Sequence, residues 1–241
     1  MNFKPIFGFI AGAFLALNLN ASTIKKGELI VATEGTYSPY SFYDEKGELV
    51  GYDVDIAKAV AQKLNLKIEF LTAPWDAMLA AFDAGKADVV FNQVSINEDR
   101  KKKYDMSVPY TMPYPVIVVH KDNNDIKSFA DLKGKKSVHS ATSNWAAIAE
   151  KNGATVVVAD GFSKGVELII SKRADDTIND NVTFFDYIKQ RPNAPLKIAY
   201  TSNEPMPTAA LLKKGNTELL EAINKALDEL KAEGKISAVS Y

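Results

Sequence analysis

The chain has 241 residues, a length that suits one large domain or two domains of about 100 residues each. Its hydrophobic content of 46% is enough for packed cores, and its formal net charge of −1 excludes the basic footprint of a nucleic-acid-binding protein. The chain has no cysteine, which excludes disulfides, thiolate metal ligands and a cysteine nucleophile, and it has only two histidines. We therefore expect neither a metal nor a cofactor.

Residues 1–21 have the pattern of a signal peptide. Lys4 supplies the positive start, Pro5 to Leu17 is an apolar run, and Asn20-Ala21 before Ser22 suits cleavage. The apolar run is too short to span a bilayer comfortably, which disfavours a membrane anchor. No cysteine follows the run, so lipid attachment at a new N-terminal cysteine is excluded. We expect an exported protein that is not lipid-anchored, located in the periplasm if the cell has an outer membrane.

The next part of the chain alternates between strand-like and helix-like patterns. A first strand opens into a loop that carries Gly35 and Pro39, and the following helix has apolar residues at helical spacing from Ile56 to Leu64. Pro74 suits the first turn of another helix, which Gly85 would end. The expected strands are 28–33, 67–72 and 87–91. This alternation predicts parallel strands with helices on their faces.

Arg100 lies just past the last of these strands. Ser95 and Glu98 have the S-x-x-E spacing of a capping box, which predicts that a helix starts there and that Arg100 is in its first turn. Ligands of open α/β sheets collect at the carboxyl ends of strands. The chain otherwise prefers lysine, and the planar fork of arginine binds a carboxylate with two hydrogen bonds. The alternative is a solvated surface charge.

A second α/β series follows the proline-bearing stretch 109–115. A capped turn is expected at Ser128, and Gly234 ends a final helix whose apolar stripe runs from Leu219 to Leu230. The expected strands of this series are 116–120, 136–139, 155–158, 176–179, 196–199 and 209–212, and the expected helices are 143–151, 163–172 and 182–190.

Several motifs resemble one family in order along nearly all of the chain after residue 22. They are FNQVSINEDRKKKYDMSVPYT (91–111), VATEGTYSPYSF (31–42), VGYDVDIAKAVAQKL (50–64), WDAMLAAFDAGKADVV (75–90), DLKGKK (131–136) and INDN (178–181). The chain is similar to the polar amino-acid binding proteins of ABC importers, the type II periplasmic binding proteins. NQVSINEDRKKKYD, HKDNNDIKSFADLKGKK and TSNW resemble the cystine-binding subgroup most.

This resemblance implies a two-lobed α/β fold. Each lobe would be a mostly parallel sheet flanked by helices, and two hinge crossings would join the lobes and allow closure around a ligand. The implied division is a signal peptide at 1–21, lobe 1 at 22–111 and 209–241, and lobe 2 at 112–208. The pattern of residues alone does not place the final helix in lobe 1.

The resemblance also implies a ligand-binding site for a free amino acid, whose carboxylate and ammonium a dry cleft must both satisfy. Arg100 would bind the carboxylate and Asp180 the ammonium, while Glu34 would reach the ligand's side chain. The other implied ligand-binding residues are Ser95, Thr142 and Ser143 on the carboxylate, Tyr37, Phe42 and Trp75 as apolar walls, and Asn92, Gln93 and Asn179 as amides.

Each of these residues also has an ordinary structural role. Thr142 and Ser143 stand at an expected helix start, where unpaired N–H groups favour an anion but where Thr and Ser are also common N-caps. The acids can be surface charges or loop caps, the amides can tie loops together, and Phe42 can be a core residue.

The expected function is that of a monomeric, non-enzymatic carrier. It would close on an L-amino acid, cystine or another polar one, and deliver it to the permease of an ABC transporter. Cysteine, glutamine, histidine and arginine remain open as cargo. The alternative is a dehydratase-like enzyme on the same scaffold, for which Glu34 and His139 are the only candidate general acids.

Overall fold

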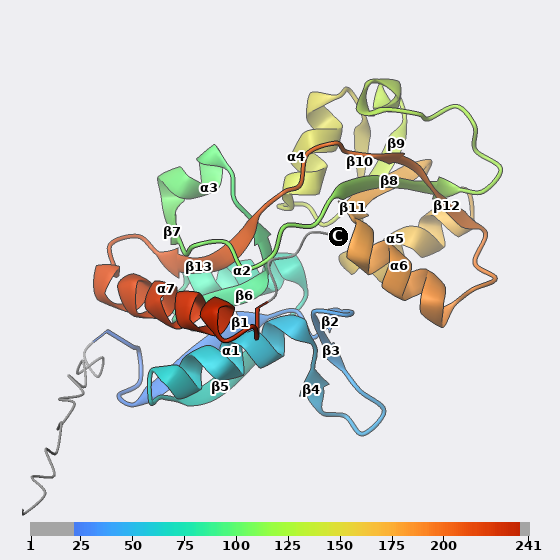
Figure 1. Ribbon diagram of the computed structural model, residues 1–241. Helices are drawn as coiled ribbons and strands as arrows, with labels where there is room; N and C mark the ends of the chain where they lie inside the picture. Colours follow the sequence, from blue (N-terminus) through green and yellow to red (C-terminus); the bar gives the residue numbers. More distant parts are fainter. Residues whose placement is uncertain (1–21, 237–241) are drawn as a thin grey trace, which may run out of the picture.

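The protein has two lobes, each built around a five-stranded sheet (Figure 1). The computed structural model describes residues 22–236, so the predicted signal peptide at 1–21 lies outside the described residues. Within 22–236, no helix is long and apolar enough to cross a membrane.

The sheet of lobe 1 has the strand order β5-β1-β6-β13-β7. Side chains alternate along β1, so Leu29 and Val31 pack with α1 and α7, while Ile30 and Ala32 pack with α2 on the other face. The elements of this lobe are β1 (Glu28–Thr33), α1 (Tyr52–Lys63), β5 (Lys67–Thr72), α2 (Trp75–Asp83), β6 (Val89–Ser95), α3 (Glu98–Lys103), β7 (Tyr104–Met106), β13 (Thr208–Lys213) and α7 (Thr217–Ala232).

A small antiparallel sheet projects from lobe 1 between β1 and α1 (Figure 1). It was not expected from the sequence, because its strands are only two or three residues long. They are β2 (Thr36–Tyr37), β3 (Ser41–Tyr43) and β4 (Leu49–Val50).

The sheet of lobe 2 has the strand order β10-β9-β11-β8-β12. Val116 and Val118 of β8 pack with α5 and α6, and Ile117 and Val119 pack on the opposite face, where α4 lies. The elements of this lobe are β8 (Pro115–His120), the 3-10 helix η2 (Phe129–Leu132), β9 (Lys136–His139), α4 (Asn144–Lys151), β10 (Thr155–Val158), α5 (Gly161–Ile170), β11 (Asp176–Asp180), α6 (Asn181–Gln190) and β12 (Leu196–Thr201).

In each sheet one strand runs against the other four. In lobe 1 this is β13, which is antiparallel to both β6 and β7, and in lobe 2 it is β8, which is antiparallel to both β11 and β12. These two strands follow directly after the two segments that cross between the lobes. Each sheet is therefore mostly parallel, as expected, and its one reversed strand marks where the chain has entered from the other lobe.

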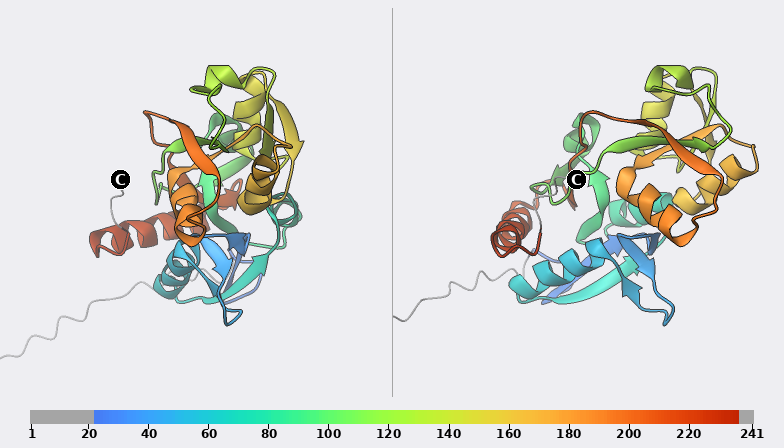
Figure 2. Two further views of the ribbon diagram at one scale, coloured as in Figure 1. Left: turned by 90° about the vertical axis from the view of Figure 1, so that its right-hand side faces the viewer. Right: turned by 45° about the vertical axis from the view of Figure 1, so that its right-hand side comes forward.

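The two crossing segments lie side by side and are bonded to each other (Figure 2). The Met206 amide donates to the Pro113 carbonyl at 2.7 Å, and the Thr208 amide donates to the Thr111 carbonyl at 3.0 Å. The predicted domain limits at 111/112 and 208/209 fall within these crossings and stay a prediction.

The helix that carries Arg100 begins where expected, but its N-cap residue is not the predicted one. Asn97, not Ser95, is the N-cap of α3, and the Asn97 side chain accepts from the Arg100 amide at 2.9 Å. The capping-box prediction for Ser95 is wrong because Ser95 is still the last residue of β6. Ser143, by contrast, caps α4 and accepts from the Ala146 amide at 3.1 Å.

Candidate ligand-binding site between the lobes

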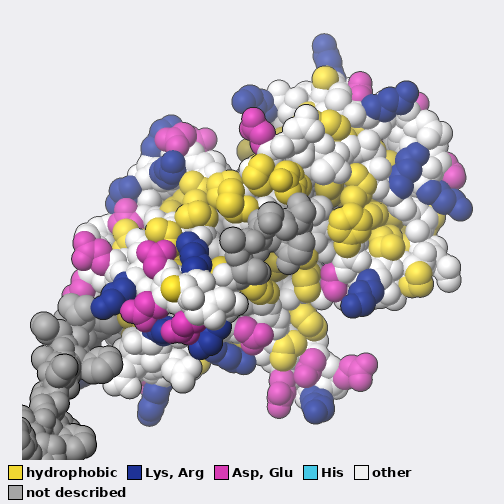
Figure 3. Space-filling model, viewed as in Figure 1, with side chains coloured by type: hydrophobic (Ala, Val, Ile, Leu, Met, Phe, Trp, Pro, Cys, Tyr) yellow, Lys and Arg dark blue, Asp and Glu magenta, His cyan; other side chains and the backbone are white. Residues whose placement is uncertain are grey.

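A pocket lies between the two lobes and is lined by both. Hydrophobic side chains also gather on the surface where the lobes meet (Figure 3). Lobe 2 lines the pocket with the carboxyl ends of β9 and β11 and the first turns of α4 and α5, in keeping with the position of ligands in α/β sheets. Lobe 1 contributes Glu34, Tyr37, Trp75, Asn92 and Gln93.

Glu34 places a carboxylate in this pocket without a cation. It follows β1, is only 7% exposed, and accepts at Oε2 from the Asn92 amide nitrogen at 2.7 Å. Burial raises the pKa of Glu34 to about 7, and no lysine or arginine of the described residues is among the groups that shift this pKa. A ligand that brings an N–H donor or a positive charge would therefore compensate Glu34.

The two neighbouring amides in β6 have different tasks. Asn92 Oδ1 accepts from the Glu34 amide at 2.8 Å, so Asn92 holds both the backbone and the carboxylate of Glu34. Gln93 also lines the pocket, but its side chain donates to Asp53 at 2.6 Å and accepts from Thr111 at 2.6 Å. Gln93 thus connects the pocket to a crossing segment.

The aromatic walls are Tyr37 and Trp75, and Phe42 is not among the residues that line the pocket. Adjacent residues of a strand face opposite sides. In β3 it is Ser41 that turns inward, where its hydroxyl accepts from the Gly35 amide at 3.1 Å. Phe42 is half-buried and pairs with neighbouring strands of the small sheet.

Arg100 lies beside the pocket and does not line it. Its guanidinium carbon is 5.2 Å from the centre of the Trp75 ring, and its Nη1 donates to the Ser95 carbonyl at 2.9 Å. Burial lowers the pKa of Arg100 to about 10, and no carboxylate of the described residues acts on it. Ser95 itself is buried and offers its carbonyl to Arg100.

The start of α4 is bound by a carboxylate from the other lobe. Asp76 of α2 accepts from the Ala141 amide at 3.0 Å, from the Thr142 amide at 2.9 Å and from the Thr142 hydroxyl at 2.5 Å. The Trp75 indole donates to the Thr142 hydroxyl oxygen at 3.0 Å. The N–H groups predicted to bind a ligand carboxylate therefore bind one in this structure, but it belongs to Asp76.

Asp180 is the N-cap of α6 and is almost fully buried, at 2% exposed. Both of its oxygens accept two hydrogen bonds: Oδ1 from the Tyr40 hydroxyl at 2.9 Å and the Thr183 amide at 2.8 Å, and Oδ2 from the Tyr37 hydroxyl at 2.7 Å and the Thr183 hydroxyl at 2.8 Å. The Tyr37 hydroxyl also lies 2.8 Å from Asn179 Oδ1, so its one proton is shared between Asp180 and Asn179. Asp180 of lobe 2 therefore forms direct hydrogen bonds with two tyrosines of lobe 1.

Of the twelve predicted residues, seven line the pocket: Glu34, Tyr37, Trp75, Asn92, Gln93, Ser143 and Asn179. Arg100 and Thr142 contact Trp75, and Asp180 contacts Tyr37, so all three lie one residue away from the pocket. Ser95 lies behind Arg100, and Phe42 stands apart.

Four residues at the site were not predicted from the sequence: Tyr40, Asp76 and the lobe 2 aromatics Trp145 and Phe162. The last two line the pocket, whereas Tyr40 and Asp76 bind across the lobes. Tyr40 stands three residues after Tyr37, and this close pair of tyrosines in a loop was a usable signal. The described residues hold no group of three or more His, Asp or Glu side chains placed to hold a metal ion.

The family model of bacterial extracellular solute-binding proteins, family 3, matches residues 29–240. The chain belongs to this family. Among its relatives, the L-cystine-binding protein TcyA of Bacillus subtilis is 43% identical over 224 residues, which are 92% of this chain and 83% of that protein. The family assignment agrees with a pocket between two lobes and with the resemblance seen in the sequence.

Two solved structures of relatives differ in how well they superimpose on this family member. An ancestral arginine-binding protein bound to glutamine has a TM-score of 0.82 at 43% identity, covering 88% of this chain and 95% of its own. The L-cystine solute receptor of Neisseria gonorrhoeae, in the unliganded open conformation, has a TM-score of 0.57 at 42% identity, covering 90% of this chain and 92% of its own. Because the two identities are nearly equal, the higher TM-score shows that this structure is closer to the ligand-bound ancestral protein than to the open receptor.

Proposed function

We propose that the protein binds L-cystine outside the cytoplasm and delivers it to the permease of an ABC importer. One observation carries the proposal. An uncompensated carboxylate, Glu34, lines the interlobe pocket, and a guanidinium without an anion, Arg100, lies directly behind the pocket residue Trp75. A free amino acid supplies an ammonium and a carboxylate together, and each would pair with the group of opposite charge.

Cystine is the proposed cargo among polar amino acids. The Bacillus subtilis relative is named for L-cystine binding, and so is the Neisseria gonorrhoeae receptor. Cystine carries two ammonium groups, so Asp180 can take one while Glu34 faces the other. A chain without cysteine also has no free thiol that could exchange with a bound disulfide.

The proposed binding sequence begins with opening of the lobes. Opening breaks the bonds from Tyr37 and Tyr40 to Asp180 and those from α4 to Asp76. The ligand ammonium then binds Asp180, and its carboxylate takes the N–H groups at the start of α4 and the free N–H groups of Arg100. Closure follows because only the closed form brings both sets of groups to the ligand.

We further propose that the protein is a monomeric periplasmic carrier without enzymatic activity. One chain supplies both lobes that line the pocket, so a second copy is not needed to complete it. Delivery requires no chemistry, and the dehydratase alternative needs a general acid in the pocket. Burial lowers the pKa of His139 to about 3, which leaves its ring neutral at physiological pH, so Glu34, with a pKa raised to about 7, is the acid that this alternative would have to use.

The test is a melting-temperature panel of the purified protein with the twenty common amino acids and L-cystine, followed by titration calorimetry of the hits. A ligand that binds only the folded state raises the melting temperature, by an amount that grows with its concentration relative to the dissociation constant. We expect the largest rise with L-cystine. No rise with any of the compounds would contradict the carrier function, and turnover of a prephenate-like substrate would contradict the absence of enzymatic activity.

A further inference from the structure

Three buried polar side chains form a hydrogen-bonded row along one face of the lobe 2 sheet, and this row ends at the pocket wall. Asp176 of β11 and Ser137 of β9 are register neighbours, and both are 0% exposed. The Ser137 hydroxyl donates to Asp176 Oδ1 at 2.5 Å, and its oxygen lies 2.8 Å from Nε2 of His139. Ser137 and His139 face the same side of β9 because they are two residues apart. His139 ends this row at the pocket.

The hydrogen bonds fix where the ring proton of His139 must be. Burial raises the pKa of Asp176 to about 7, so at pH 8 its carboxylate is ionised and only accepts, and the single hydroxyl proton of Ser137 points to Asp176. The Ser137 oxygen must then accept from His139, which requires a proton on Nε2. Burial lowers the pKa of His139 to about 3, so the ring is neutral and carries only that one proton. Nδ1 is therefore a bare hydrogen-bond acceptor.

This acceptor is available to a ligand. The ring of His139 is only 6% exposed, lines the pocket, and forms no other hydrogen bond with the described residues. Nε2 is directed back along β9 toward Ser137, so the opposite edge of the ring is the one left for the pocket. Glu34 lines the same pocket with a carboxylate.

Asp176 accepts few hydrogen bonds for a buried carboxylate. Among residues 22–236, its Oδ2 has no hydrogen-bond partner and its Oδ1 is held by Ser137 alone. Asp175 and Lys135 are the charged groups that act on it, in opposite directions, and Val119 is its register neighbour on the other side, in β8. Burying such a group costs stability, and a role in the pocket would account for its presence.

We propose that Asp176, acting through Ser137, holds His139 in the tautomer that presents Nδ1 to the pocket as an acceptor for an N–H group of the bound amino acid. Asp176 and Ser137 are positioning residues, and His139 determines specificity by selecting a ligand with a donor at this wall. The proposal rests on the proposed function for the ligand, but the tautomer does not depend on any ligand.

The first experiment reads the tautomer without a ligand. Nitrogen-15 NMR of the imidazole rings distinguishes a protonated from a bare ring nitrogen, and the chain has only His120 and His139, so His120→Gln assigns the spectrum. At pH 8 we expect Nε2 of His139 to be protonated. Ser137→Ala should convert His139 to a mixture of tautomers, Ser137→Thr should restore it because the hydroxyl is kept, and the exposed control Ser171→Ala should change nothing. A protonated Nδ1 in the unmodified protein, or an unchanged tautomer in Ser137→Ala, overturns the proposal.

The second experiment measures L-cystine binding by titration calorimetry. His139→Leu, which has no acceptor, should lose about ten-fold in affinity, and His139→Gln, whose carbonyl can accept, should lose about three-fold or less. Ser137→Ala should weaken binding by about three-fold, in step with its tautomer mixture. Failure of the unmodified protein to bind L-cystine refutes the proposed function and leaves the NMR result standing. Binding by the unmodified protein that His139→Leu does not weaken overturns the role of His139.

Discussion

The Tyr40 hydroxyl of lobe 1 donates to Asp180 of lobe 2 at 2.9 Å, although 140 positions separate the two residues. This bond joins the lobes without a ligand, and the Tyr37 hydroxyl makes a second such bond to the other oxygen of Asp180. The closed arrangement is thus partly held by the protein itself.

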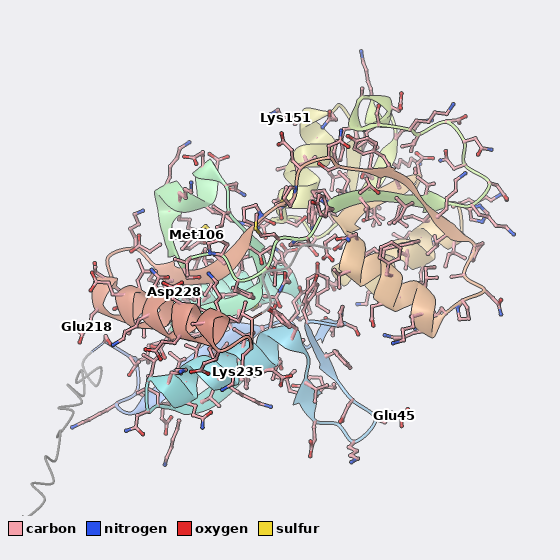
Figure 4. All side chains as sticks on the ribbon, viewed as in Figure 1. Glu45, Met106, Lys151, Glu218, Asp228 and Lys235 are labelled. Atoms are coloured by element: carbon pink, nitrogen blue, oxygen red, sulfur yellow. The ribbon has the colours of Figure 1, made fainter. Side chains whose placement is uncertain are left out.

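Tyr40→Phe should open the ligand-free protein. Losing one hydrogen bond to a carboxylate, worth about 1.5–3 kcal/mol, would lower the closed-to-open ratio by about ten- to 150-fold. Because the chain has no cysteine, dyes can be attached at Glu45→Cys and Lys151→Cys, which lie on different lobes (Figure 4). Energy transfer between the dyes should fall in Tyr40→Phe.

The matched control is Tyr43→Phe, whose hydroxyl contacts Thr72 within lobe 1. It should leave the energy transfer unchanged. Equal energy transfer in Tyr40→Phe and the unmodified protein would show that this bond does not hold the lobes together.

Arg100→Ala should reduce the affinity for L-cystine at least ten-fold while the fold persists. A hydrogen bond to a charged group contributes about 1.5–3 kcal/mol, and the Arg100 guanidinium lies 5.2 Å from the ring of Trp75 in the pocket wall. Titration calorimetry measures the loss. Arg191→Ala, which removes an arginine stacked at 4.7 Å on Tyr187, is the control and should bind normally. Unchanged affinity in Arg100→Ala would remove Arg100 from the site.

Affinity for L-cystine should rise between pH 6 and pH 8. Burial raises the pKa of Glu34 to about 7, so the free protein holds a proton there at pH 6, and binding of an ammonium favours the ionised carboxylate. Binding near pH 6 should therefore release a proton, which calorimetry in buffers of different ionisation enthalpy detects. Glu34→Gln should abolish this proton release and the rise, and the exposed control Glu45→Gln should keep both. A pH-independent affinity in the unmodified protein would contradict contact between Glu34 and the ligand.

Asp53→Asn should stabilise the protein at pH 8. Asp53 is 0% exposed and accepts from Gln93 at 2.6 Å through Oδ1, while its Oδ2 has no hydrogen-bond partner in the described part of the chain. Burial raises its pKa to about 7, above the usual 3.8, so the folded state keeps a proton that the unfolded state has lost. Its contribution to stability is present below pH 4 and is lost as the pH rises through 7, and by pH 8 the penalty is on the order of 2–4 kcal/mol.

Urea unfolding across pH 4–8 checks this expectation. The gain in unfolding free energy from Asp53→Asn should grow up to about pH 7 and then level off, following the titration of the buried carboxyl. Asp55→Asn, an exposed position in the same first turn of α1, should show no such pH-dependent gain. A destabilised Asp53→Asn at pH 8 would mean that the ionised carboxylate is needed for the fold.

Much of the fold followed from the sequence where hydrophobic pattern and turn residues agree. The strands at 28–33, 67–72, 136–139 and 155–158 have the predicted bounds, because each is flanked by glycine, proline or polar turns. The small sheet β2-β3-β4 and the strand β7 were missed because two or three residues are too few to show an alternation. The Asn97 cap was missed because the S-x-x-E spacing pointed two residues earlier.

The sequence pointed to part of the pocket lining but not to the contacts across the lobes. Seven predicted residues line the pocket, since they lie at strand ends and helix starts that the motifs mark. The partners of Asp180 and Thr142 were not predictable, because the distant Tyr40 and Asp76 reach them only when the lobes close. Alternation in a three-residue strand was also too weak a signal to tell that Ser41, rather than Phe42, turns inward.

Main-chain hydrogen bonds tie the segment around Pro113 to that around Met206, so neither connector can twist independently of the other. The lobes then separate by rotation about one axis that passes through both connectors. A chimera that exchanges one lobe with a relative must carry over both connectors as a pair, or the two halves will meet at the wrong angle.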